Sequence, residues 1–552
     1  MLFISIVLVG RLCANQKILA LLGIKENLEW YEYFWVGLTV VVGILQIWSI
    51  FLPVDVYSFS FVLGLAVISL ILEVKNGVKL PSFSSLLKIL IKNINMVAIS
   101  IVVLLTISYS ASLPVGWEDT LLYHLNAVKW NHLYPVVPGL TNLHLRLGVS
   151  SSLFLFASMI ESFAGGRSSH IALSLLASVL SLQFIWIFLK TNTRMIKLFC
   201  LLVLPLFVSS ILRRTLVASL SPDFALVIIA LAISYEFLKG DRKSFLVAGV
   251  LSVLLLTVKL SGFSFGAAVL VFASYKLMRL AKKIFLRISM LFTLVGIFIL
   301  IPYLVRDVIL SGWLFYPLPM FRINVPWAVP ESIVNLMSTI IKAWAIAPGV
   351  GWREQVGLPF WQWFPGWYTR NNWAIEMKML FFGTSLILIA PLIKIVNKDL
   401  INKASNFIFL GIASLAGVFY VLFAAPDFRF GEVYFWIFFS VIASYYINII
   451  LEREPNFKVF FVALICYFTF IVTWPVRIDS KPIGRSVRWE QSFPVVDYII
   501  TPGDGSPEFK ILIPTESELC GNSDLPCAPG AEFLKIKERV PGDISKGYLP
   551  IN

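Results

Sequence analysis

Two adjacent carboxylates, Glu118 and Asp119, stand directly after a long apolar run of the sequence. Ionisable groups at the edge of a membrane-spanning segment are costly to keep there, so they are candidates for function. A carboxylate in this place could act as a general base, which takes a proton from an attacking hydroxyl group. Alternatively, the aspartate could cap the next helix, because Leu121, Leu125 and Val128 follow at helical spacing. The two roles are compatible.

Three cations, Lys259, Arg306 and Arg429, are predicted at the same outer level of the membrane. Several cations that face one cavity are what a phosphate leaving group requires. The alternative for Arg306 and Arg429 is that they are only anchors, whose long side chains reach toward the membrane surface. Asp223 and Asp427 stand at the starts of two further apolar runs, and Asp223 could simply cap its helix.

The histidines invite a metal interpretation, which their spacing does not favour. His124, His132 and His144 are separated by 8 and 12 residues, which does not form a standard ligand pair on one helix face. Hydrogen bonding near the membrane interface is the favoured role. The hypothesis allows a divalent metal ion but the sequence does not indicate one, and no residue is assigned as a metal ligand.

Two cysteines lie close together in the polar C-terminal segment, in the sequence CGNSDLPC. A disulfide between Cys520 and Cys527 would require an oxidising compartment. The alternative is two free thiols in a loop.

The composition decides what kind of protein must position these groups. The chain has 552 residues with 58% apolar and 14% charged residues, and its formal net charge is +14. Ordinary soluble chains carry roughly 25% charged residues. A soluble domain could not bury so much apolar surface, which excludes a soluble enzyme, a disordered chain and a secreted disulfide scaffold. We expect an all-α polytopic membrane protein with 12 to 14 transmembrane helices.

Apolar runs long enough to cross a bilayer recur along the chain, and basic clusters separate them. We expect spans near 35–52, 56–74, 95–113, 168–189, 197–212, 222–238, 284–305, 379–396, 406–425, 431–451 and 458–474. The segment 1–23 is a helix of uncertain insertion. Lys and Arg cluster in alternate loops, which the positive-inside rule places in the cytoplasm. The regions 114–167, 213–222, 306–378 and the tail 475–552 then lie outside.

Residues 245–275 need a bend, because both flanks are basic and a single helix of this length would be too long for the bilayer. We expect a hairpin that turns at Ser261 and Gly262, with Lys259 at its tip.

The outer regions are expected to contain interfacial structure. Polar residues interrupt 120–166, which is typical of helices that lie in the membrane interface, and Pro135 and Pro138 break it into two pieces. The loop 306–378 holds 8 of the 17 tryptophans, which indicates an aromatic belt or a folded lid. The tail is a small loop-rich cap. We therefore divide the chain into N-terminal helices at 1–94, a core at 95–474 and the tail at 475–552.

The layout resembles the C-type (GT-C) superfamily of integral-membrane glycosyltransferases, which includes the protein mannosyltransferase and aminoarabinose transferase families. The resemblance covers most of 95–475. It is carried by Trp117-Glu118-Asp119, Ser221-Pro222-Asp223, the hairpin turn Thr257-Val258-Lys259-Leu260-Ser261, Arg306 leading into Ser311-Gly312-Trp313-Leu314-Phe315-Tyr316-Pro317, and Asp427-Phe428-Arg429-Phe430.

The resemblance implies that the donor is a sugar on a polyprenyl phosphate. It makes Asp119 the catalytic base and Glu118 its neighbour or substitute, and it implies that the lipid phosphate binds to Lys259, Arg306 and Arg429. His124, Asp223 and Asp427 are supporting candidates. The expected partners are membrane lipids, the lipid-linked sugar and a glycan, lipid or protein acceptor. The expected place is the inner (plasma) membrane, with the active site and tail extracytoplasmic.

Two other functions compete with this hypothesis. A glycan polymerase or ligase would use a lipid-linked oligosaccharide through a similar loop and similar arginines. A lipid-glycan transporter or flippase would place charges near mid-membrane and show internal two-fold symmetry of hydropathy, which the sequence lacks. Nucleic-acid binding is not expected, because the positive charge is scattered over loops on one side of a membrane.

Overall fold

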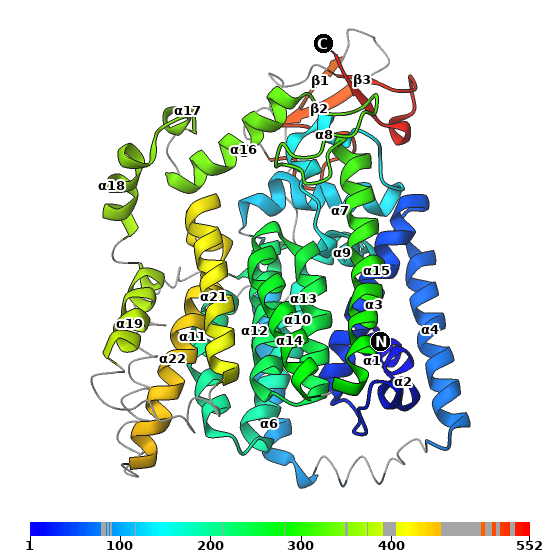
Figure 1. Cartoon of the computed structure of the whole chain (residues 1–552). Coiled ribbons are helices and arrows are strands. Elements are labelled where there is room, and N and C mark those ends of the chain that lie inside the picture. The colour runs from blue at the N-terminus through cyan, green and yellow to red at the C-terminus, as the bar shows by residue number, and fades with distance from the viewer. Residues whose placement is uncertain are drawn as a thin grey trace.

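The structure is a computed structural model, and it shows a mostly helical chain (Figure 1). It describes residues 1–78, 84, 88, 91–115, 117–212, 215–280, 282–347, 352–371, 374–389, 405–453, 498–502, 510–514, 519–529 and 536–551. The expected span 458–474 and the pair Arg213-Arg214 lie outside these residues.

Nine helical segments of the described residues are long and apolar enough to cross a membrane. They are α3 (Trp30–Phe51), α4 (Val56–Lys75), α6 (Ile94–Ala111), α10 (Ser168–Lys190), α11 (Arg194–Leu212), the segment Leu260–Leu280 that contains α14 (Phe263–Leu280), the segment Lys282–Ser311 that contains α15 (Phe285–Ser311), α21 (Ser405–Ala424) and the segment Glu432–Ile449 of α22 (Glu432–Arg453). The chain is therefore a multi-pass membrane protein, as its composition predicts.

Helix α12 (Pro222–Lys239) lies at the centre of the bundle. Every residue from Phe224 to Leu238 is buried, so the helix is surrounded by protein on all sides. Pro222 begins it with a preset φ, and Gly240 ends it in the left-handed conformation at φ 77°. The outermost helices α4, α6 and α15 instead leave many apolar side chains exposed, which a lipid environment accommodates.

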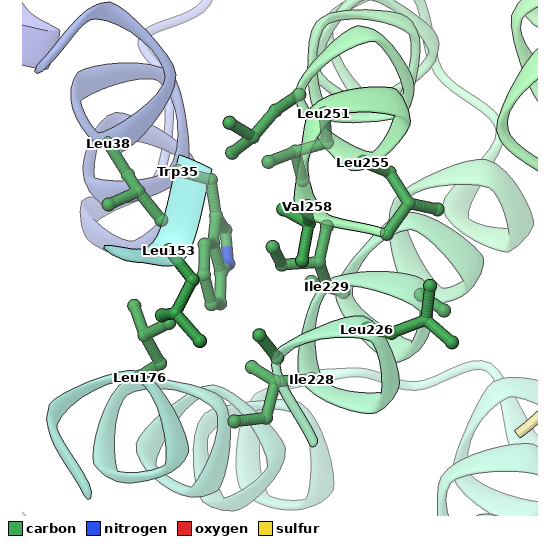
Figure 2. Packing of buried hydrophobic residues seen from close by; sticks show 14 of the residues in the cluster. Trp35, Leu38, Leu153, Leu176, Leu226, Ile228, Ile229, Leu251, Leu255 and Val258 are labelled. Atoms are coloured by element: carbon green, nitrogen blue, oxygen red, sulfur yellow. The ribbon is translucent and has the colours of Figure 1, made fainter. Parts of the chain in front are cut away.

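The core around Trp35 joins five helices (Figure 2). Trp35 of α3 faces Leu153 of α9 (Ser152–Ala164) and Leu176 of α10, with side chains from α12 and α13 (Arg242–Val258) completing the cluster. Its indole Nε1 donates to Gln183 Oε1 at 2.8 Å, so the polar end of this buried ring is satisfied. The cluster fixes the helices on which the site described below is built.

The predicted hairpin is present. Helix α13 ends at Val258, Lys259 has an extended backbone, and the short helix η4 (Leu260–Gly262) turns the chain into α14. Tyr434 of α22 donates its hydroxyl to Ser261 O at 2.9 Å. The tip of the hairpin, with Lys259, is thereby anchored to a helix from the other end of the sequence.

The first outer loop contains several short helices, as its polar interruptions predict. The π-helical turn η1 (Thr120–His124) runs into α7 (Leu125–Leu133), and α8 (Leu140–Leu143), η2 (Leu145–Gly148) and α9 follow. The break between α7 and α8 falls at Pro135 and Pro138, and Gly139 has a φ of 68°. These pieces lie at one end of the bundle, which we call the site end (Figure 1).

The segment 1–23 forms two short helices, α1 (Leu2–Cys13) and α2 (Gln16–Leu21), where the sequence indicated one of uncertain insertion. Twelve residues of α1 reach only about 18 Å, which is too short to cross the bilayer. Helix α1 crosses α3 where Gly10 meets Gly37: a Cβ on Gly10 would lie 1.9 Å from Tyr33 O. Small residues allow this close contact between helices.

The loop 306–378 and the helix after it form α16 (Glu331–Ile346), α17 (Trp352–Gln355), α18 (Phe360–Asn371) and α19 (Ile375–Ile389). Trp367 of α18 donates its indole N–H to Pro426 O at 2.6 Å. Its ring also lies against Phe428, with 5.7 Å between the centroids. The tryptophan-rich segment is thus folded against the Asp427–Phe430 region.

The tail forms two small antiparallel sheets at the site end, where the sequence indicated only short regular pieces (Figure 1). β1 (Tyr498–Pro502) pairs with β2 (Lys510–Pro514), and β3 (Ile536–Glu538) pairs with β4 (Tyr548–Pro550). Cys520 and Cys527 form the predicted disulfide. Gly521 N donates to Leu121 O at 2.8 Å, so the tail contacts the π-turn directly.

The disulfide gives a count of thiols that labelling can check. We expect reduction of the denatured protein to add two maleimide-reactive thiols, because Cys520 and Cys527 are joined whereas Cys13 and Cys200 are free. A gel-shift assay with a polyethylene-glycol maleimide measures this count. The variant Cys520→Ser/Cys527→Ser should gain none on reduction. Equal labelling of the parent protein before and after reduction would contradict the pairing.

Candidate functional site

Asp119 lies between two arginines from distant parts of the chain. Arg146 Nη1 donates to Asp119 Oδ1 at 2.9 Å, and Arg429 Nη1 donates to Asp119 Oδ2 at 3.3 Å. The Asp119 side chain is 19% exposed, and those of Arg146 and Arg429 are 30% and 34% exposed. Both carboxylate oxygens are therefore occupied, and the ion pairs are still open to solvent or to a ligand.

The backbone around Asp119 has an unusual conformation. The residue directly precedes the π-turn η1, in which Leu125 N donates to Thr120 O. Single π-helical turns inside helices are rare and are frequently found at functional sites. The Thr120 hydroxyl accepts from Leu220 N at 3.3 Å, which ties the turn to the segment before α12. The turn is thus held next to the segment that leads into the central helix, with Asp119 directly before it.

His124 ends the π-turn and lies inside the protein. Its ring is packed against Tyr123 and Phe154, with centroid distances of 4.3 and 5.1 Å, and Thr120 Oγ1 lies 3.4 Å from its Nδ1. Burial lowers the pKa of His124 to about 3, although the Asp119 charge acts in the opposite direction. The ring is therefore neutral at physiological pH and supports the turn as a packed, uncharged group.

The charges around Asp119 keep it ionised. Burial acts to raise the pKa of this carboxyl, whereas the positive charges of Arg429 and Arg146 lower it, and the result is a pKa below the usual value. A carboxylate with a low pKa is a weak proton acceptor. A role as general base therefore requires that at least one of its cationic partners moves away.

A second ion pair lies beside the first. Lys259 Nζ, at the tip of the hairpin, contacts Asp223 Oδ1 at the start of α12, and Ser221 Oγ donates to Asp223 Oδ2 at 3.3 Å. The Phe430 ring links the two pairs, because Lys259 Nζ lies 4.2 Å and Arg429 Cζ lies 4.8 Å from its centroid. An aromatic face attracts both cations and holds them in one small region.

Asp427 supports Arg429 from the other side. Asp427 Oδ1 accepts from the Arg429 backbone N at 3.0 Å and caps η6 (Phe428–Phe430), while its Oδ2 lies 3.1 Å from Arg429 Nε. In these pairs the three cations Arg146, Arg429 and Lys259 face the three carboxylates of Asp119, Asp427 and Asp223. The predicted residues of the later outer segments thus meet those of the first loop.

Two residues that were predicted for the site, Glu118 and Arg306, do not take part in the ion-pair cluster. Glu118 is exposed, while its neighbour Asp119 points into the ion-pair cluster. Arg306 is only 5% exposed and donates to Ser49 Oγ at 2.5 Å and to Asn131 Oδ1 at 2.9 Å. The expected end of the helix near 305 is wrong, because α15 continues to Ser311 and keeps Arg306 within the helix. Its contacts with α3 and α7 favour a structural role over phosphate binding.

Arg146 is the site residue that sequence reasoning missed. In the sequence it is one of several polar residues that interrupt an interfacial segment, and no motif or spacing connects it with Asp119. The guanidinium also lies 5.8 Å from the Tyr123 ring centroid, which helps to orient it toward the π-turn. The available signal was the presence of an arginine in the same outer loop as the acidic pair.

Of the other two predicted histidines, His132 contacts backbone oxygens and His144 is partly buried. His132 Nδ1 lies 3.1 Å from Val54 O and 3.2 Å from Ser158 O, and burial lowers the pKa of His144 to about 3. Over the part of the chain that the structure describes, no group of three or more His, Cys, Asp or Glu residues could hold a metal ion.

The structural role of Arg306 can be tested by its removal. We expect Arg306→Met to lower the free energy of unfolding by about 3 kcal/mol, because loss of one partner leaves buried polar groups uncompensated. Thermal unfolding in detergent, followed by tryptophan fluorescence, measures the effect. Arg322→Met, at an exposed position, is the matched control and should unfold like the parent. An Arg306→Met protein as stable as this control would refute the buried role.

Comparison with known proteins gives a family and no activity. No curated protein and no solved structure matches the chain. Residues 1–436 match the family described as a domain of unknown function (DUF8201). The matched range includes Asp119, Arg146, Lys259 and Arg429, and thus the whole ion-pair cluster, and it ends before the tail. Because the match covers most of its length, the chain belongs to the DUF8201 family.

Proposed function

We propose that the protein is a membrane glycosyltransferase that moves a sugar from a polyprenyl-phosphate donor to a glycan, lipid or protein acceptor. The observation that carries the proposal is the arrangement of a carboxylate, Asp119, with Arg429 and Lys259 in one solvent-accessible cluster at the end of a membrane bundle. A base and several cations in one place are what this reaction requires.

The site residues act on two different groups, the attacking acceptor hydroxyl and the leaving phosphate. Asp119 accepts the proton of the acceptor hydroxyl as its oxygen forms a bond to the anomeric carbon. The bond between that carbon and the phosphate oxygen breaks, and its electron pair leaves with the phosphate. Arg429 and Lys259 stabilise the charge that develops there. Asp223 and Asp427 hold the two cations in position through the ion pairs described above.

The bundle supports a site at its outer surface. Lys75, Lys190 and Lys239 stand at the ends of α4, α10 and α12, and α12 begins with the site residue Asp223 at its opposite end. Basic residues at one end favour the cytoplasm for that end. The disulfide lies in the tail at the site end, and disulfides persist in oxidising compartments. Both features support an extracytoplasmic site.

The clustering of charges at one end also favours chemistry over transport. Residues that bind a transported substrate lie near mid-membrane, commonly in broken helices. Here Asp119 and Asp427 directly precede η1 and η6, and Asp223 lies in the first turn of α12, at the site end of the bundle. Both a single-sugar donor and a lipid-linked oligosaccharide would present a phosphate to these cations, and the experiment therefore uses both.

The proposal predicts that Asp119 is required for transfer. We expect Asp119→Asn to reduce the transfer rate by at least about 100-fold, because an amide cannot take the acceptor proton. Purified protein in lipid nanodiscs is supplied with polyprenyl phosphates that carry glucose, mannose or galactose and with a lipid-linked oligosaccharide. Release of polyprenyl phosphate or pyrophosphate in the presence of an envelope extract measures the reaction.

Two further variants sharpen this test. Asp524→Asn, an exposed aspartate of the tail, is the matched control and should retain parental activity. Glu118→Gln distinguishes the roles of the two adjacent carboxylates. We expect it to lose much less transfer activity than Asp119→Asn. A folded Asp119→Asn protein that transfers sugar at the parental rate would refute the assignment of the base. Lipid movement across vesicles without any covalent product would favour a flippase instead.

A further inference from the structure

We propose that the Asp119 carboxylate occupies, in the ligand-free site, the place of the donor's phosphate on Arg429, and that the incoming phosphate displaces it. The inference rests on the proposed function and adds a mechanism of regulation to it. The site would then be an anion-exchange site, in which the base becomes effective only when the phosphate is bound.

The geometry points to Arg429 as the partner that is exchanged. Its contact with Asp119 is 3.3 Å, longer than the 2.9 Å contact of Arg146. A guanidinium binds carboxylate and phosphate oxygens in the same planar manner. At 34% exposure, the Arg429 side chain can be reached without unfolding of the surrounding helices.

The neighbours of Arg429 favour a phosphate over a carboxylate. Lys259 lies on the same Phe430 ring, so an anion bound to Arg429 is also close to a second cation. Asp119 contacts Arg429 and Arg146, and no ion pair between Asp119 and Lys259 is found among the described contacts. The donor's phosphate diester has two non-bridging oxygens and can place one on Arg429 and the other on Lys259, which a carboxylate held by Arg146 does not do.

Arg146 keeps the base in place during the exchange. Once Arg429 has turned to the phosphate, Asp119 retains only the Arg146 contact, and one of its oxygens is free. Loss of a neighbouring positive charge makes a carboxylate a better proton acceptor. The free oxygen is then available to the acceptor hydroxyl, while the π-turn and Arg146 maintain its orientation.

Charge is balanced through the reaction. The donor phosphate is a diester with one negative charge. Sugar transfer breaks the bond between the anomeric carbon and the phosphate oxygen and leaves a monoester with a second negative charge. The acceptor proton passes to Asp119, which becomes neutral. When this proton is released to solvent, the restored carboxylate competes again for Arg429 and drives the polyprenyl phosphate out of the site.

The exchange predicts an affinity that increases when the base is removed. We expect Asp119→Asn to bind a C55 polyprenyl phosphate at least roughly tenfold more tightly than the parent, because the competing carboxylate is gone. Arg429→Gln should bind it roughly tenfold more weakly. The double variant Asp119→Asn/Arg429→Gln should bind no more tightly than Arg429→Gln, since the two effects share one contact. Native mass spectrometry of lipid titrations in detergent measures these affinities.

The controls separate this inference from the proposed function. Asp524→Asn should bind like the parent, Asp119→Ser replaces Asp119→Asn if the latter does not fold, and phosphatidylglycerol replaces the polyprenyl phosphate in a parallel titration. Unchanged or weaker binding by a folded Asp119 variant would overturn the exchange, even if its transfer activity is lost. If Asp119→Asn gained as much affinity for phosphatidylglycerol as for the polyprenyl phosphate, the assignment of a polyprenyl ligand would be overturned. If Asp119→Asn binds more tightly but the parent protein itself transfers no sugar, the exchange is supported and the glycosyltransferase proposal is rejected.

Discussion

The double ion pair of Asp119 is the interaction on which the geometry of this end of the molecule depends. Asp119 comes from the turn after α6, Arg146 from η2 and Arg429 from η6, so one carboxylate joins three separate segments. Charged side chains next to a bilayer are costly unless they are paired. The pairing constrains the first outer loop and the start of α22 to meet above the central helix.

The membrane bundle provides the rigid support for these loops. Helix α12 is buried along nearly its whole length and presents Asp223 at its first turn, where a carboxylate also interacts favourably with the helix dipole. The α13–α14 hairpin brings Lys259 to the same point, and Tyr434 fixes its tip to α22. The loops can vary their conformation while the positions of Asp223 and Lys259 stay defined by packed helices.

Features that depend on local sequence patterns could be predicted from the sequence. The hairpin followed from basic flanks around an over-long apolar segment, and the Cys520–Cys527 bond from close spacing in a polar tail. Scarce carboxylates and cations near helix ends indicated Asp119, Asp223, Lys259 and Arg429, which the structure brings together. Their proposed roles in catalysis follow from the chemistry of these side chains.

Other features depend on tertiary packing and left no local signal. The partnership of Arg146 with Asp119 arises because two parts of one long loop fold against each other. Arg306 was expected to face the cations, but α15 extends past it and directs it toward Ser49 and Asn131. The split of 1–23 into two helices and the π-turn at Thr120–His124 are equally invisible in apolar periodicity.

The contact between the tail and the π-turn at Thr120–His124 has a consequence for biosynthesis. Gly521 N donates to Leu121 O, and Lys129 Nζ donates to Ser523 O at 2.8 Å, so a segment that the ribosome adds after the membrane helices completes the contacts of the π-turn that follows Asp119 and of α7. A nascent chain that still lacks residues 519–529 has its bundle but not this backbone partner. The site therefore acquires its final form only late in synthesis, when the chain is long enough to reach back over its own first loop.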